Sequence, residues 1–200
     1  MTRRLTVYTD YKSPYAFVAN AAILALEESH GVTLDWRPYT LRIAEFLDPV
    51  ASRSAHNWRK VRYAYRDARR FANQQGLVLK GPVRIFDAWL ASAGMLFAQA
   101  NGFFPAYHQT VFTRFWAHQL DLDVLDELVS LVDEIAGLGA ALRAYAEGPA
   151  AAEHEALRLE AEGLGVFGVP TLVLDGELYW GGDRLSLVKE QLAARGRAGG

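Results

Sequence analysis

Residues 165–185 read GVFGVPTLVLDGELYWGGDRL, and this stretch decides the fold. Residues 169–174 are rich in β-favouring side chains and predict a strand. Asp175-Gly176 is a strong β-hairpin turn, and it leads into a second predicted strand at 177–180. An amphipathic helix is expected to follow at 185–194. The end of the chain is therefore predicted as strand, strand, helix.

The beginning of the chain predicts a complementary unit. Leu5–Thr9 favours a strand, and Val32–Pro38 alternates apolar with polar residues as a second strand does. Between them, Ser13 can cap a helix that begins at Pro14 and continues to about Ser29. A strand, helix and strand in this order give a parallel pair of strands with a right-handed crossover.

The middle of the chain shows helical periodicity and almost no strand pattern. Helices are expected at 60–74, 86–100, 104–118, 123–136, 138–147 and 149–163. The whole order is that of an α/β thioredoxin fold with a large all-helical insertion at about 40–163. We expect one domain over residues 1–200, with a frayed tail at 195–200.

Composition limits the classes of function. The 200 residues are 51% hydrophobic and carry a formal net charge of −2, which predicts no nucleic-acid partner. Cysteine is absent, so the chain has no disulfide, thiolate metal site or redox chemistry of its own. The five histidines show no metal-ligand spacing, and we expect no metal. Without a long apolar run, we expect a cytoplasmic protein with no membrane partner, and a homodimer.

Three motifs together resemble a known family. They are DYKSPYA at 10–16, GVFGVPT at 165–171 and DGELYWGGDRL at 175–185. In this order and separation they resemble the 2-hydroxychromene-2-carboxylate isomerases, which belong with the kappa-class glutathione transferases in the DsbA-like thioredoxin superfamily. Arg59-Lys60, Tyr63 and Asp67 also resemble the first insertion helix of that family.

Ser13 is the candidate catalytic residue. The N–H groups at a helix N-terminus favour a negative charge, which relatives with Cys-X-X-Cys use to lower a cysteine pKa. Here Ser13 and Ala16 occupy those two positions, so Ser13 either only caps the helix or also donates to a thiolate brought by a cofactor. The resemblance implies that the cofactor is glutathione. It implies further that the thiolate adds to a conjugated enone carbon, a bond rotates, and elimination returns the thiol.

The resemblance also implies which residues bind glutathione. Val169 would pair with its cysteinyl unit beside a cis Pro170, although a proline can also simply begin an edge strand. Gly182 would offer its N–H to the γ-glutamyl carboxylate, and Asp183 would bind the α-amino group or act as an ordinary helix cap. Lys60 would contact the glycyl end, whereas most neighbouring basic residues are expected to form a solvated face.

The substrate half of the site departs from the family pattern. Tyr15 and Trp180 are the candidate substrate-binding residues. The family often has an asparagine where this chain reads Val50-Ala-Ser-Arg-Ser54, and residues 81–87 also differ. We expect a glutathione-dependent isomerase of a small aromatic enone carboxylate. The alternatives are a kappa-like glutathione transferase, or a DsbA-like domain that binds an extended peptide or small acid without catalysis.

Overall fold

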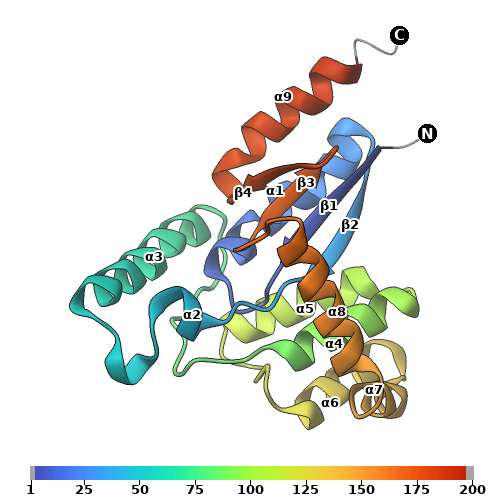
Figure 1. Cartoon of the computed structure of the whole chain (residues 1–200). Coiled ribbons are helices and arrows are strands. Elements are labelled where there is room, and N and C mark those ends of the chain that lie inside the picture. Colours follow the sequence, from blue (N-terminus) through green and yellow to red (C-terminus); the bar gives the residue numbers. More distant parts are fainter. Residues whose placement is uncertain (1–2, 197–200) are drawn as a thin grey trace.

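The computed structural model describes residues 3–196, and the main elements follow the predicted order (Figure 1). The elements are β1 (Arg3–Thr9), α1 (Pro14–His30), β2 (Val32–Pro38), α2 (Ile43–Leu47), η1 (Val50–Ser52), α3 (Ala55–Gln74), α4 (Trp89–Ala100), α5 (Phe104–Trp116), α6 (Leu125–Ala136), α7 (Gly139–Ala146), α8 (Ala150–Gly163), β3 (Thr171–Leu174), β4 (Glu177–Trp180), η2 (Gly182–Arg184) and α9 (Leu185–Gly196). Within residues 3–196, no helix combines the length and the apolar character needed to cross a membrane.

The four strands form one sheet in the order β2-β1-β3-β4. Strands β1 and β2 are parallel, with Leu5 opposite Leu34, and β3 is antiparallel to both of its neighbours. Asp175 and Gly176 both have positive φ angles, as the tight hairpin turn between β3 and β4 requires. The sheet and its order are those of the thioredoxin fold that the sequence predicts.

The helices divide into two groups around this sheet (Figure 1). Helix α1 packs against α9 and α3, whereas α4 and α8 contact β2. Helices α4 to α8 also contact one another and form the helical group beside β2. The first turn of α1 therefore lies where the sheet, α3 and the helical group meet.

Helix α3 is longer than predicted. It begins at Ala55 rather than Lys60, because the Ser54 hydroxyl accepts a hydrogen bond from the N–H of Asn57 at 3.1 Å and caps the helix. The short helices α2 and η1 just before it were not predicted, since they are too short for a helical period to be recognised.

Helix α4 begins three residues later than predicted, at Trp89 instead of Phe86. One carboxylate oxygen of Asp123 accepts hydrogen bonds from the N–H groups of Asp87 and Ala88, each at 3.0 Å. Ala88 also has a φ of 67°, which is outside the α-helical region, so the helix cannot begin before Trp89. Other predicted boundaries differ by one or two residues, and the end of the tail, residues 197–200, lies outside the described part of the chain.

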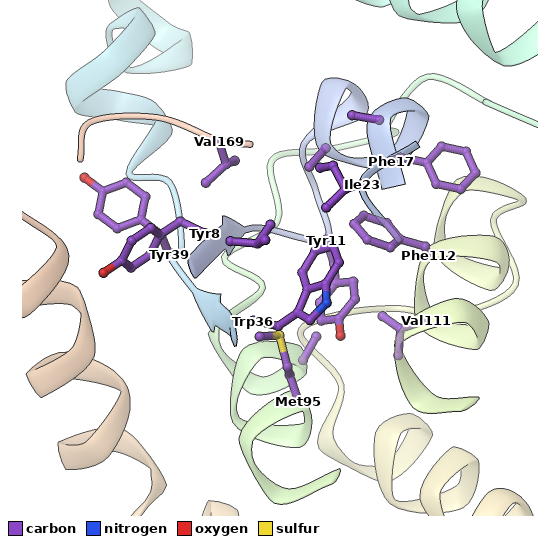
Figure 2. Packing of buried hydrophobic residues seen from close by; sticks show 14 of the residues in the cluster. Tyr8, Tyr11, Phe17, Ile23, Trp36, Tyr39, Met95, Val111, Phe112 and Val169 are labelled. Atoms are coloured by element: carbon purple, nitrogen blue, oxygen red, sulfur yellow. The ribbon is translucent and has the colours of Figure 1, made fainter. Parts of the chain in front are cut away.

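A row of buried hydrogen bonds connects α1 to α5 and to the loop before α1. The Tyr11 hydroxyl lies 3.0 Å from His108 Nδ1, and His108 Nε2 lies 2.9 Å from Asn20 Oδ1 on α1. Because the Asn20 oxygen only accepts, Nε2 carries the proton and Nδ1 accepts from Tyr11. Tyr11 also packs edge-on against Phe112 at 4.8 Å between ring centroids (Figure 2).

Burial lowers the pKa of His108 to about 3, so this histidine is neutral in the folded protein. In the unfolded chain it titrates near its ordinary value of about 6.5. Its contribution to stability is therefore complete above pH 6.5 and is lost progressively as the pH falls from there toward 3. We expect this one group to reduce the free energy of unfolding by about 2 kcal/mol between pH 7 and pH 5.

Urea unfolding at the two pH values tests this, with His108→Gln as the variant that cannot titrate. The pH dependence should be smaller in the variant by about that amount. In NMR spectra of the wild type, the ring resonances of His108 should not shift between pH 8 and pH 5. Equal pH dependence in the two proteins would show that the pKa of His108 is not lowered in the folded state.

Candidate active site

The loop that leads into α1 is fixed by a buried ion pair. The Asp10 carboxylate is fully buried and accepts hydrogen bonds from the backbone N–H groups of Lys12 at 3.1 Å and Leu41 at 2.8 Å. The Lys12 ammonium, also buried, lies 3.3 Å from Asp10 Oδ2 and donates to the carbonyl of Asp87. These contacts join the end of β1, the loop that follows β2 and the segment before α4.

Ser13 caps α1 and is itself only 4% exposed. Its hydroxyl oxygen accepts from the N–H of Ala16 at 3.2 Å. The hydroxyl proton faces the carbonyl oxygen of Val169, but at 3.5 Å, which is longer than a good O–H···O hydrogen bond. Ser13 therefore serves as the predicted cap and keeps a proton that a stronger acceptor could take.

Val169 and Pro170 lie directly across from Ser13. The peptide bond between them is cis, and both residues are buried. Within residues 3–196 the N–H of Val169 makes no hydrogen bond, whereas the carbonyl of Pro170 accepts from the N–H of Gly181 at 2.8 Å. The N–H of the residue whose carbonyl faces the Ser13 hydroxyl is thus free to pair with an extended ligand.

Gly182 and Asp183 are brought against α1 by the turn after β4. A Cβ on Gly182 would lie 2.9 Å from the Cβ of Ala19, so only glycine allows this close approach. The N–H groups of Gly182 and Asp183 begin η2 and have no partner in the described part of the chain. The Asp183 side chain is 72% exposed and pairs with Arg184 at 2.5 Å.

Tyr15 connects the first turn of α1 to α3. Its hydroxyl donates to Asp67 Oδ2 at 3.1 Å. Burial, the charge of Asp67 and this hydrogen bond raise the pKa of Tyr15 to about 12, with smaller contributions from Tyr63 and Asp183. Tyr15 is thus a neutral donor held by α3, and Lys60, on the same helix, is exposed with no hydrogen bond or ion pair inside residues 3–196.

Trp180 stands at the edge of the site. It is half exposed and packs against Phe167, which is also exposed, with 4.7 Å between ring centroids. The indole covers Gly168, where a Cβ would lie 2.6 Å from its nitrogen. A cavity of about 230 Å³ opens beside Phe167 and Tyr39, and a larger one of about 660 Å³ lies between α5, α6 and residues 80–86.

The structure thus gathers six of the predicted residues around the N-terminus of α1: Ser13, Tyr15, Val169, Pro170, Gly182 and Asp183. Lys60 and Trp180 border this group rather than entering it. Sequence reasoning missed Asp10 and Lys12, although two charged residues inside an otherwise buried motif could have indicated a buried pair.

Comparison with known proteins supports the family and the fold. The family model of the DSBA-like thioredoxin domain matches residues 4–193. A 2-hydroxychromene-2-carboxylate isomerase of Pseudomonas putida is 28% identical over 92% of each chain, and one of Sphingobium xenophagum is 26% identical over 96% of this chain and 99% of its own. A solved structure of a 2-hydroxychromene-2-carboxylate isomerase superimposes with a TM-score of 0.82 at 26% identity, covering 98% of this chain and 97% of that one.

The Asp10–Lys12 pair should contribute strongly to stability. Lys12→Met leaves a buried carboxylate without its cation, and removing one partner of a buried pair costs about 3–5 kcal/mol. Arg70→Met is the matched control, because Arg70 pairs with Asp67 on the surface, where a pair contributes about 0–1 kcal/mol. Chemical denaturation of both variants measures the difference, and equal losses would show that the buried pair has no special weight.

Proposed function

The chain belongs to the DSBA-like thioredoxin domain family. We propose that it is a glutathione-dependent isomerase of a small aromatic enone carboxylate. The observation that carries the proposal is the Ser13 hydroxyl, which caps α1 and faces the carbonyl of Val169, a residue whose N–H has no partner within residues 3–196. The chain has no cysteine, so any nucleophilic sulfur at this position must arrive with a ligand.

The unpartnered groups of the site fit glutathione. Ser13 would donate its proton to the sulfur, and the N–H of Val169 would pair with the cysteinyl unit. Within residues 3–196 the N–H groups of Gly182 and Asp183 have no partner, and they suit the γ-glutamyl carboxylate. The exposed Asp183 carboxylate, which pairs with Arg184, would also accept from the neighbouring ammonium. Lys60 has no ion-pair partner in the same residues and would bind the glycyl end.

The residues of the chain supply orientation and charge stabilisation. The N-terminus of α1 and the Ser13 hydroxyl favour an anion at this point, which lowers the pKa of a thiol bound there. The buried Asp10–Lys12 pair keeps Ser13 in place. Tyr15, held neutral by burial and by Asp67, keeps its hydrogen bond to Asp67 over the physiological pH range and so fixes α3 beside the first turn of α1. When bound, glutathione supplies a thiolate that can attack a conjugated carbon and so permit rotation about that bond.

Two measurements separate this proposal from its alternatives. An isomerase converts 2-hydroxychromene-2-carboxylate without consuming glutathione, whereas a kappa-like transferase consumes it with an electrophilic substrate. A domain that only binds extended peptides should bind glutathione and S-methylglutathione almost equally. A site that holds a thiolate should bind glutathione far better than the methylated form.

Ser13→Ala should lower turnover sharply. The loss of a hydrogen bond to a charged acceptor costs about 1.5–3 kcal/mol, or roughly 10- to 150-fold in rate. The ultraviolet absorbance of bound thiolate should appear only at a higher pH in the variant. The loss of the cap should cost only about 1 kcal/mol of stability, so the fold is expected to remain intact.

Ser54→Ala is the matched control, because Ser54 caps α3 through the same kind of hydrogen bond. It should cost similar stability and leave the thiolate absorbance of the complex unchanged. If Ser13→Ala keeps the wild-type turnover and thiolate pKa, Ser13 is a structural cap only.

Asp183→Asn should weaken glutathione binding by about fivefold, or roughly 1 kcal/mol, because the amide cannot pair with an ammonium. Gly181 is the N-cap of η2 and no side chain caps it, so Asp183 is not the ordinary helix cap that the sequence also allowed, and the substitution removes no cap. Glu190→Gln, which changes an exposed carboxylate on α9, controls for the change in net charge. Calorimetric titration compares the three proteins, and equal affinities would show that Asp183 does not bind the ligand.

A further inference from the structure

Helix α3 has two flanks, one on each side of its buried stripe. Ala68 and Ala72 form the stripe that packs inward. Residues seven apart lie almost on one line along a helix, so Lys60 and Asp67 share one flank. That flank faces Tyr15, whose hydroxyl binds Asp67, and it therefore lies on the side of the proposed glutathione site.

The opposite flank carries Trp58 and Tyr65, which are also seven residues apart. The Tyr65 ring lies 6.3 Å from the ring of Trp116, which stacks on Phe17 of α1 at 5.9 Å. Phe17 donates its N–H to the carbonyl of Ser13. This second flank lies on the side of α3 away from Tyr15, and Trp116 and Phe17 link it to Ser13.

Tyr65 presents an unused hydroxyl on this flank. The residue is half-buried, and its hydroxyl has no hydrogen-bond partner anywhere in residues 3–196. Burial, with the charge of Asp10 acting in the same direction, raises the pKa of Tyr65 to about 12. Tyr65 is neutral and its hydroxyl is not closed off from solvent, so the hydroxyl can donate to an acceptor of a bound ligand.

Arg53 provides an unneutralised cation nearby. Its Nε donates to the carbonyl of Leu47 at 2.7 Å and its Nη2 to that of Asp48 at 3.0 Å. The guanidinium lies over the ring of Trp58, 4.8 Å from the centroid, and no carboxylate of the described residues pairs with it. The charge of Arg53 also acts on Tyr65, where it lowers the pKa and partly offsets the effect of burial.

Arg53 differs from the other arginines near it. Arg59, Arg62 and Arg66 are also unpaired, but they are exposed to solvent. Arg53 is half-buried and held by backbone carbonyls, so its charge is positioned before any ligand arrives. A fixed guanidinium and a neutral hydroxyl are the donors that a carboxylate binds well.

We propose that Arg53 and Tyr65 form a carboxylate-binding subsite on the Trp58 flank of α3, and that it holds the carboxylate of the substrate. The inference rests on the proposed function and extends it, because it assigns the substrate to the flank opposite Lys60 and Asp67. It also gives a role to residues 50–54, where the chain departs from the family pattern. The glycyl carboxylate of glutathione is the other source of the same chemistry, and the test separates the two.

The probe is chromone-2-carboxylate, an aromatic bicyclic acid, and its methyl ester is the uncharged counterpart. Binding is followed without glutathione through tryptophan fluorescence, since Trp58 lies under Arg53. The wild type should bind the acid at least tenfold more tightly than the ester. Arg53→Gln and Tyr65→Phe should each remove most of this preference, whereas Arg66→Gln, on the outward face of α3, should keep it.

Tyr65→Phe preserves the ring, so it remains informative if Arg53→Gln disturbs the segment that the arginine holds. A wild type without preference for the acid, or a preference that survives both variants, would overturn the proposal. So would an Arg53→Gln protein that binds glutathione more weakly but the acid normally, because the subsite would then serve the glycyl end. Absence of turnover in the wild type with this preference intact would contradict the isomerase function alone.

Discussion

The carboxylate of Asp10 is the point on which the candidate site depends. It is fully buried, and its oxygens bind the backbone after β1, the backbone after β2 and the ammonium of Lys12. Lys12 in turn binds the carbonyl of Asp87, which belongs to the helical part of the chain. A buried charge is unfavourable unless it is paired and hydrogen-bonded, so these partners are held together by the cost of separating them.

This arrangement makes the N-terminus of α1 a prepared position for an anion. Ser13 follows Lys12 directly, and its hydroxyl faces the carbonyl of Val169, whose N–H has no partner within residues 3–196. A helix N-terminus and a fixed hydroxyl need little rearrangement when charge appears. The chain has no cysteine, so under the proposed function the sulfur at this position would arrive with glutathione.

Local patterns predicted what local physics determines. The strands, the hairpin at Asp175 and the cap at Ser13 are set by residues close in sequence, and they were predicted correctly. The start of α4 was wrong because a carboxylate more than thirty residues away, Asp123, binds its leading N–H groups. The proposed subsite of Arg53 and Tyr65 was not predicted from the sequence for a similar reason, since only the folded chain shows that these two side chains lie near each other without a carboxylate partner.

The two flanks of α3 suggest how this architecture separates its tasks. Ser13, Val169 and Gly182 belong to the sheet, its loops and α1, where a change would disturb the core. Arg53 and Tyr65 belong to the segment that follows β2, where Arg53 precedes α3 and Tyr65 packs against the edge of the core beside Trp116. Under the proposed function, substrate contacts on this helix can change without moving Ser13, whose hydroxyl would stabilise the thiolate. A departure from the family pattern at residues 50–54 therefore affects the proposed substrate contacts and leaves the Ser13 cap in place.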